Sequence, residues 1–394
     1  MAYEEQVILA LLEISVFAFL AETMRGAVKR LGIPNVVGEI VAGMILGPYA
    51  LGGVLDYITG YNVFTLNPYL LFLSEFSMIL LVFASGLEHG VGALREAGLW
   101  GFAGAALGAL LPFGASVALY SSRIGLGSSL VLGTAMGATS LAVAASVIRD
   151  LGLKGRGVNF MMAAAAADDV VDLILLSVIL GFTSSSGFLG LLRTVGFYTL
   201  AWVLIFAVSV VLIPRVANRM SERYIEEMPF VVLFGLTAVM TAIGFSPVIS
   251  AFIAGVSLAE SLKAERIRQV TETLLSVFGS IFFVVVGAQV NLVTLTIQGV
   301  ELSLELTAVA IVFKVVGIIP FVYLHTRDVK ESFAVSLGMT PRGETGLVVA
   351  SVGKSYGLLD QQEFTAVVLM SLLTTLIGAI SFRRTEKWIT RGDP

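Results

Sequence analysis

The chain has 394 residues, of which 57% are hydrophobic and only 13% are charged, and its mean hydropathy is +0.94. Soluble domains are about 25% charged, so this composition predicts a protein that crosses a membrane several times. The net charge of −4 gives no reason to expect a nucleic-acid partner, and the lack of cysteine excludes disulfides, thiolate metal sites and thiol catalysis.

Thirteen apolar stretches are predicted to span the bilayer, the eighth and ninth being short. In chain order they are 6–24, 34–52, 68–87, 98–121, 127–148, 157–182, 190–213, 228–244, 247–261, 271–291, 302–324, 331–352 and 362–382. With the N-terminus outside, 19 of the 24 Lys and Arg residues fall in cytoplasmic loops, as the positive-inside rule requires. We therefore expect a multi-pass cell-membrane protein with a cytoplasmic C-terminus and no soluble regulatory domain after the last span.

The thirteen spans divide as six, one and six. The span at each position of the first six then runs opposite to its counterpart seven spans later, as in an inverted repeat. The predicted fold class is an all-α polytopic membrane protein forming one transporter unit over residues 1–394.

The third and fifth spans carry polar residues at membrane depth. Glu75 lies in the middle of the third span, where it either supports a site or makes a helix contact. Residues 133–146 of the fifth span are mostly small or hydroxyl-bearing, which indicates either an interrupted helix or close packing between helices.

The sixth span carries two adjacent aspartates, Asp168 and Asp169, near its centre. An ionised carboxylate in hydrocarbon costs about 2.5–3.5 kcal/mol, and two neighbours also repel each other. Because folding gains nothing from them, the pair predicts a cation or proton site. Asp172 follows Asp168 by one helical turn and either lines the same pathway or is peripheral.

The eleventh span contains a lone lysine, Lys314, too far from either end for its side chain to reach water. Such a lysine must lose its proton or find a carboxylate, and one of the two aspartates is the obvious partner. Because Asp168 and Asp169 point about 100° apart on a helix, one can face Lys314 while the other faces a water-filled cavity.

The twelfth span holds proline, arginine, glycine and glutamate at membrane depth, at positions 341–344. Proline removes a backbone donor and interrupts the helix, and Arg342 and Glu344 need buried partners. The fifth and twelfth spans occupy corresponding places in the two sets of six. Paired broken spans of this kind point to a transporter's binding site, so we expect two discontinuous helices.

These residues together resemble the monovalent cation:proton antiporters, specifically the NapA-like sodium/proton antiporters of the second antiporter family. The similarity covers nearly the whole chain, and each motif is modest alone but specific in combination. The matching segments are 36–48, 82–88, 137–140, 166–173, 246–261, 282–290, Lys314 and 339–350, with Ser250 where the family usually has glycine.

The resemblance implies a role for each residue of the site. Asp169 would be the main ligand of the alkali cation, and Asp168 the aspartate paired with Lys314. Thr139 and Ser140 would lie beside them at the helix crossing.

The resemblance also implies that Arg342 and Glu344 support the second broken helix, and that the chain forms a homodimer among membrane lipids. A mobile core would carry the ion past a dimerisation part in an elevator-like movement. The parts would be residues 1–90 and 228–291 for dimerisation, 190–227 for a linker helix, and 98–182 with 302–382 for the core.

The resulting hypothesis is an electrogenic sodium or lithium/proton antiporter, a secondary active transporter without cofactor or catalytic residue. The chain has two adjacent aspartates and is expected to lack a nucleotide-binding domain, and both features favour this hypothesis over a potassium/proton antiporter of the same fold. A sodium-coupled solute symporter is a further alternative. An intramembrane aspartyl protease is disfavoured, because its carboxylates must converge from two helices.

Overall fold

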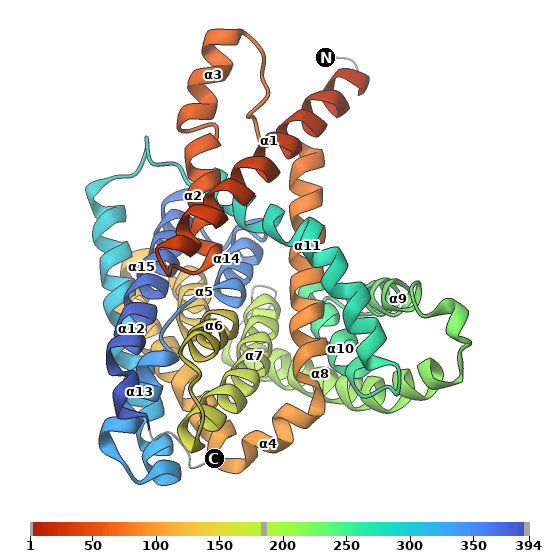
Figure 1. Ribbon diagram of the computed structural model, residues 1–394, viewed down its shortest axis with the longest axis vertical. Coiled ribbons are helices and arrows are strands. Elements are labelled where there is room, and N and C mark those ends of the chain that lie inside the picture. The colour runs from red at the N-terminus through yellow and green to blue at the C-terminus, as the bar shows by residue number, and fades with distance from the viewer. Residues whose placement is uncertain (1–2, 183–186, 390–394) are drawn as a thin grey trace.

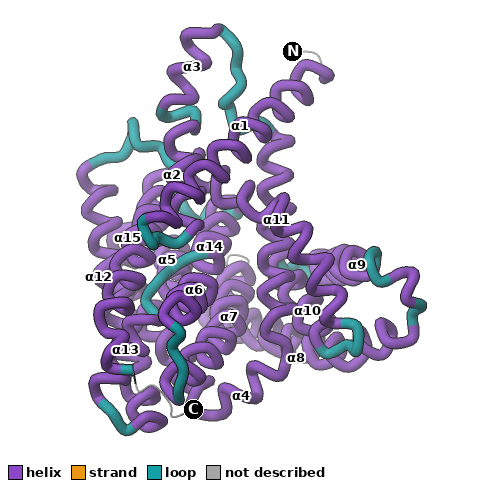
Figure 2. Tube along the Cα trace, viewed as in Figure 1, coloured by secondary structure: helices purple, strands orange, loops and turns teal. Residues whose placement is uncertain are grey.

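The structure, a computed structural model, describes residues 3–182 and 187–389. Over these residues the chain folds into helices joined by short loops, without any strand (Figure 2). The α-helices are α1 Tyr3–Arg30, α2 Asn35–Leu46, α3 Leu51–Thr59, α4 Pro68–Ile124, α5 Leu126–Gly137, α6 Leu141–Leu151, α7 Arg156–Phe182, α8 Gly187–Arg219, α9 Met228–Ala242, α10 Pro247–Ala259, α11 Ala264–Ala288, α12 Ile297–Thr326, α13 Val329–Gly338, α14 Glu344–Ser355 and α15 Gln361–Thr385.

The predicted spans are confirmed as helices. Within the described ranges, nine helical segments are long and apolar enough to cross a membrane. The four other predicted spans correspond to α7, which carries three aspartates, to the shorter apolar helices α9 and α10, and to the α13–α14 pair. The prediction of an all-helical polytopic protein with two interrupted spans is therefore correct.

Two predicted boundaries differ from the structure. The third and fourth spans belong to one 57-residue stretch, α4, which bends where Gly90 and Gly98 leave helical geometry with φ of 56° and 58° (Figure 1). Glycine takes such angles without steric cost, so the chain turns there without a loop. The second span also ends earlier than predicted, at Leu46, and a separate short helix, α3, follows it.

The part of α4 before Gly90 runs between two groups of helices (Figure 1). α5, α6, α7 and α12 to α15 lie on one side of it in this view, α9 and α10 lie on the other, and α8 passes behind it. The part of α4 after Gly98 packs against α5, α7 and α12. Close backbone contacts hold the second side together. A Cβ at Gly86 of α4 would meet the Phe252 carbonyl of α10, and one at Gly255 would meet the Phe83 carbonyl. Small residues at such crossings let membrane helices approach closely, so α4 is fixed against α10.

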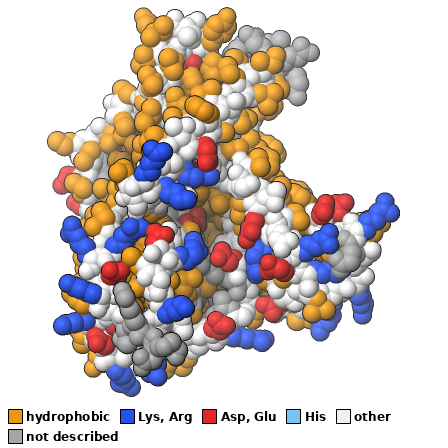
Figure 3. Space-filling view, viewed as in Figure 1, with side chains coloured by type: hydrophobic (Ala, Val, Ile, Leu, Met, Phe, Trp, Pro, Cys, Tyr) orange, Lys and Arg blue, Asp and Glu red, His pale blue; other side chains and the backbone are white. Residues whose placement is uncertain are grey.

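Charged and apolar side chains occupy different parts of the surface. Hydrophobic side chains cover most of the region around α1 and α3, whereas Lys, Arg, Asp and Glu side chains lie over the middle and lower part of the face in Figure 3. Large apolar side chains such as Phe19, Leu200 and Leu304 are exposed along the long helices. This is the surface of a protein whose helices face lipid.

Candidate functional site

The two interrupted spans cross each other at their breaks. α5 ends at Gly137 and α6 begins at Leu141, while α13 ends at Gly338 and α14 begins at Glu344. The extended segments between them pair directly, because the Ser140 amide donates to the Pro341 carbonyl at 2.9 Å. The predicted pair of discontinuous crossing helices is thus confirmed.

Side chains tie the same crossing. The Thr139 hydroxyl donates to the Met339 carbonyl at 3.2 Å, and the Ser140 hydroxyl donates to the Glu344 carboxylate at 2.8 Å. A Cβ at Gly343 would lie 2.5 Å from the Ser140 Oγ, so only glycine fits at this position. Thr139, Ser140 and Glu344 therefore lie at the crossing, as the resemblance implied.

Arg342 braces the second break from within. Its side chain is fully buried, and it donates to the carbonyls of Met339 at 3.1 Å, Thr340 at 3.0 Å and Ala310 at 3.1 Å. Two of these carbonyls belong to the interrupted segment after α13 and have left the helical ladder there. The guanidinium thus supplies the donors that the broken backbone lacks, and it brings a positive charge into the centre of the molecule.

Asp168 and Lys314 form a fully buried ion pair. The Lys314 Nζ lies 2.7 Å from the Asp168 Oδ2 and 2.6 Å from the carbonyl of Gly137, the last residue of α5. Neither side chain is exposed. The lysine on α12 therefore has the carboxylate partner that its burial requires, and it also satisfies a carbonyl at the end of the first broken helix.

Asp169 lies in a different environment from its neighbour. Its Oδ1 accepts a hydrogen bond from the Thr345 hydroxyl of α14 at 2.9 Å, and its Oδ2 accepts one from the Ser85 hydroxyl of α4 at 2.8 Å. The side chain keeps 5% exposure. The helical period correctly predicted that the two aspartates would face different surroundings, but it identified neither Ser85 nor Thr345.

Asp172 and Glu75, the two other acids singled out from the sequence, take no part in these hydrogen bonds. Asp172 is fully buried one turn after Asp168, and its oxygens have no hydrogen-bond partner among the described residues. Glu75 lies on the wall of a cavity of about 280 Å³, together with Lys354 of α14 and Gln289, which directly follows α11. The structure thus brings Asp172 to the aspartate pair and places Glu75 in a cavity of its own.

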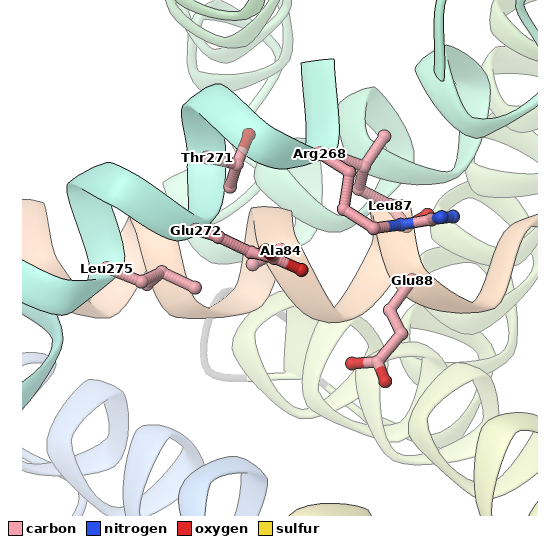
Figure 4. A pocket seen from close by; sticks show the side chains of 7 residues that line it. All are labelled: Ala84, Leu87, Glu88, Arg268, Thr271, Glu272 and Leu275. Carbon is pink, nitrogen blue, oxygen red and sulfur yellow. The ribbon is translucent and has the colours of Figure 1, made fainter. Parts of the chain in front are cut away.

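A second cavity, of about 320 Å³, lies between α4 and α11 (Figure 4). We call it the α4–α11 cavity. Glu272 extends from α11 toward Ala84 of α4, and the Glu88 side chain points away from α11. With Arg268 on the same wall, the cavity carries a small excess of negative charge. Ala84 directly precedes Ser85, so the cavity lies beside the α4 contact of Asp169.

Comparisons with known proteins agree with this architecture. The family model described as sodium/hydrogen exchanger, transmembrane, matches residues 15–388. The chain is 30% identical over 358 residues to the Na⁺/H⁺-K⁺ antiporter GerN of Bacillus cereus, covering 88% of this chain and 89% of that protein. It is 28% identical to the high-affinity Na⁺/H⁺ antiporter NhaS3 of Synechocystis, covering 92% of this chain and 87% of the relative.

A solved structure shares the fold. The sodium proton antiporter MjNhaP1 of Methanocaldococcus jannaschii superposes with a TM-score of 0.69 at 13% identity, covering 98% of this chain and 99% of that one. This match confirms the predicted fold. The family model and GerN confirm the resemblance to sodium/proton antiporters that the motifs indicated.

Proposed function

The chain belongs to the sodium/hydrogen exchanger family, and from this membership we propose that it exchanges Na⁺ or Li⁺ for protons across the membrane. The observation that carries the proposal is the difference between the two central aspartates. Asp168 is held by the buried ammonium of Lys314, whereas the Asp169 carboxylate accepts from two neutral hydroxyls. Hydroxyl and carboxylate oxygens are the ligands that hard cations prefer.

In this proposal a proton and one alkali cation compete for Asp169. Each neutralises the carboxylate, and a loaded site crosses the membrane interior more readily than an empty one, because an uncompensated charge at the midplane is costly. That cost couples the two fluxes. Asp168, Asp169 and Lys314 together provide positions for more than one proton per cation, which would make the exchange electrogenic.

The movement we propose is elevator-like. Residues 98–182 and 302–382 would carry the ion as a mobile core, past a dimerisation part formed by residues 1–90 and 228–291, with residues 190–227 as linker. Two features support this division. Gly86 and Gly255 fix α4 to α10, and both broken helices lie with α7 and α12 on the other side. We also propose a homodimer with the N-terminus outside, in keeping with the positive-inside distribution of basic residues.

A potassium/proton exchange is the second candidate. GerN, the relative at 30% identity, is named as an Na⁺/H⁺-K⁺ antiporter, and the oxygen ligands around Asp169 do not by themselves distinguish the two cations. Proteoliposomes with an imposed pH gradient, titrated with Na⁺, Li⁺ and K⁺ in turn, decide between them. We expect Na⁺ and Li⁺ to collapse the gradient at lower concentration than K⁺.

The same proteoliposomes test the assignment of Asp169. Asp169→Asn should abolish the cation-dependent collapse of the pH gradient, because an amide cannot exchange a proton for a cation. The matched control is Asp150→Asn on the exposed end of α6, which should leave exchange intact. Exchange retained by the Asp169 variant would contradict the proposal.

A further inference from the structure

We propose that the Ser85 hydroxyl is a ligand of the transported cation on one side of the membrane only, so that the site binds more tightly from that side. The inference rests on the proposed function and adds a residue to its site. Ser85 belongs to α4, whereas Asp168, Asp169 and Thr345 lie on α7 and α14. The Asp169 carboxylate is thus held from two parts of the molecule that the proposed movement would separate.

The position of the Ser85 hydroxyl suits a cation ligand. Its Oγ lies 2.8 Å from the Asp169 Oδ2, with its hydrogen donated to that oxygen. A hydroxyl carries one rotatable hydrogen and two lone pairs. When a cation replaces the hydrogen bond, rotation about the C–O bond turns a lone pair toward the cation while the oxygen stays in place. Thr345 can do the same at the Asp169 Oδ1, 2.9 Å away.

The hydroxyls implied by the family resemblance are engaged elsewhere in this arrangement. Thr139 donates to the Met339 carbonyl, and Ser140 donates to Glu344, so both stabilise the crossing of the broken helices. Ser85 and Thr345 are the residues whose hydroxyls bond to the Asp169 carboxylate among the described contacts. The local geometry therefore assigns the hydroxyl ligands to these two positions.

α4 holds Ser85 rigidly. The next residue, Gly86, packs so closely on α10 that a Cβ there would meet the Phe252 carbonyl. Because α4 and α10 pack backbone against backbone at Gly86, the backbone around Ser85 stays with α10 when the core moves. A core that shifts along the part of α4 before Gly90 must leave the Ser85 hydroxyl behind.

The neighbouring positions on α4 offer no substitute. The residues four and seven positions before Ser85 lie on the same face of the helix as Ser85. Here these residues are Leu81 and Met78. A shift of one or two turns, about 5 or 11 Å, would therefore bring Asp169 opposite apolar side chains. Met78 lines the cavity that contains Lys354, at the other end of this face. A core that moves toward that cavity therefore loses the Ser85 hydroxyl as a ligand of the cation.

The α4–α11 cavity identifies the side with the tighter site. Its α4 wall includes Ala84 and Glu88, which flank Ser85, and its charged groups include one more acid than base. Neither Ser85 nor Asp169 lines this cavity, but Ala84 directly precedes Ser85 on its wall. In the proposal a cation from this cavity therefore meets Asp169 while Ser85 is still in place. A cation that comes from the side of the Lys354 cavity meets Asp169 after the shift, with Thr345 but without Ser85.

The test compares right-side-out and inside-out membrane vesicles prepared from the same cells, in which the apparent KM for the cation is measured from each side. Ser85→Ala should raise the KM about three- to ten-fold on the side of the α4–α11 cavity and leave the other side unchanged. Ser85→Ala removes a ligand of the cation from the loaded site. It also removes the hydrogen bond to the Asp169 carboxylate from the empty site, so part of the effect on the KM cancels. Ser85→Thr, which keeps the hydroxyl, should restore the wild-type values.

Two control variants separate a sided ligand from a structural role. Ser77→Ala removes a buried hydroxyl from the same helix that bonds only to the Leu73 carbonyl in the described contacts, and should change neither KM. Thr345→Val removes the hydroxyl on α14, which the proposal moves together with Asp169, and should raise both KM values.

A gain-of-function pair covers the case in which Ser85→Ala does not fold. Leu81→Ser and Met78→Ser place a hydroxyl one and two turns along the same face, and at least one should lower the KM on the opposite side. An equal change on both sides in Ser85→Ala, or no change, overturns the sided ligand while the proposed function stands. Wild-type vesicles that exchange no cation from either side refute both together.

Discussion

Replacing Lys314 with methionine should destabilise the protein through the carboxylate that it leaves behind. Lys314 and Asp168 are both fully buried, with Nζ and Oδ2 2.7 Å apart. Removing one member of a buried pair costs about 3–5 kcal/mol, because the other remains as an uncompensated charge. The Gly137 carbonyl also loses its 2.6 Å hydrogen bond, which adds about 1–3 kcal/mol.

The double variant Asp168→Asn/Lys314→Met isolates the two contributions. Without either charge, the groups that lack the Lys314 partner are neutral, namely the Gly137 carbonyl and the side-chain amide at position 168, so the double variant should be about 3–5 kcal/mol more stable than Lys314→Met alone. The free energy of unfolding in mixed detergent micelles, followed by circular dichroism, measures each variant. The surface pair Arg123–Glu305 provides the control, with the arginine Nη1 2.9 Å from the glutamate Oε2. Arg123→Met should cost about 0–1 kcal/mol, because water screens this pair.

The outcome that would refute this reasoning is a double variant that is no more stable than Lys314→Met alone. If the single and the double variant lose the same free energy, the Asp168 carboxylate does not depend on Lys314, and the separation of the two aspartates into a paired and an exchanging group has no energetic basis.

Three further predictions concern the crossing helices and the carboxylate beside them. Arg342→Met should cost about 3 kcal/mol or more and abolish exchange, because three buried carbonyls each lose a hydrogen bond and Met339 keeps only the one from Thr139. The same micelle unfolding and proteoliposome assays measure both effects. Gly343→Ala should abolish exchange, because the added methyl group would overlap the Ser140 side chain of the other broken helix. Gly114→Ala, where the added methyl group would meet open space, should leave exchange intact. Equal activity of the two variants would show that the crossing tolerates the displacement. Thr345→Val should raise the KM for the cation by about ten-fold, through loss of the hydroxyl at Asp169, and an unchanged KM in a Na⁺ titration would exclude that hydroxyl as a ligand.

The strongest predictions from sequence were those in which burial leaves few choices. A lysine in the middle of an apolar span must lose its proton or find a carboxylate, and one of the two adjacent aspartates was the obvious partner. The structure joins Lys314 to Asp168 for that reason. The break of the twelfth span was also predictable, because Pro341 cannot donate a backbone hydrogen bond. The fifth span left close helix packing open as an alternative, and only its corresponding place in the other set of six favoured a break.

The hydroxyl partners of Asp169 could not be predicted in the same way. Serine and threonine are tolerated in membrane helices because they can bond to the carbonyl one turn earlier, as Ser77 does with Leu73. Ser85 therefore looks like any other serine in an apolar run, and only the packing of α4 against α7 reveals its contact with Asp169. The bend of α4 at Gly90 and Gly98 escaped prediction because charged residues between two spans normally indicate a loop.

The central claim is that a proton and an alkali cation occupy Asp169 in turn, and proton release on cation binding tests it most directly. Purified protein in weakly buffered detergent solution, near the pH at which half of the sites hold a proton, should acidify the medium when Na⁺ is added. Asp169→Asn should release none, and choline should have no effect on the wild type. Binding of Na⁺ without any release of protons, or equal release from the Asp169 variant, would contradict the account.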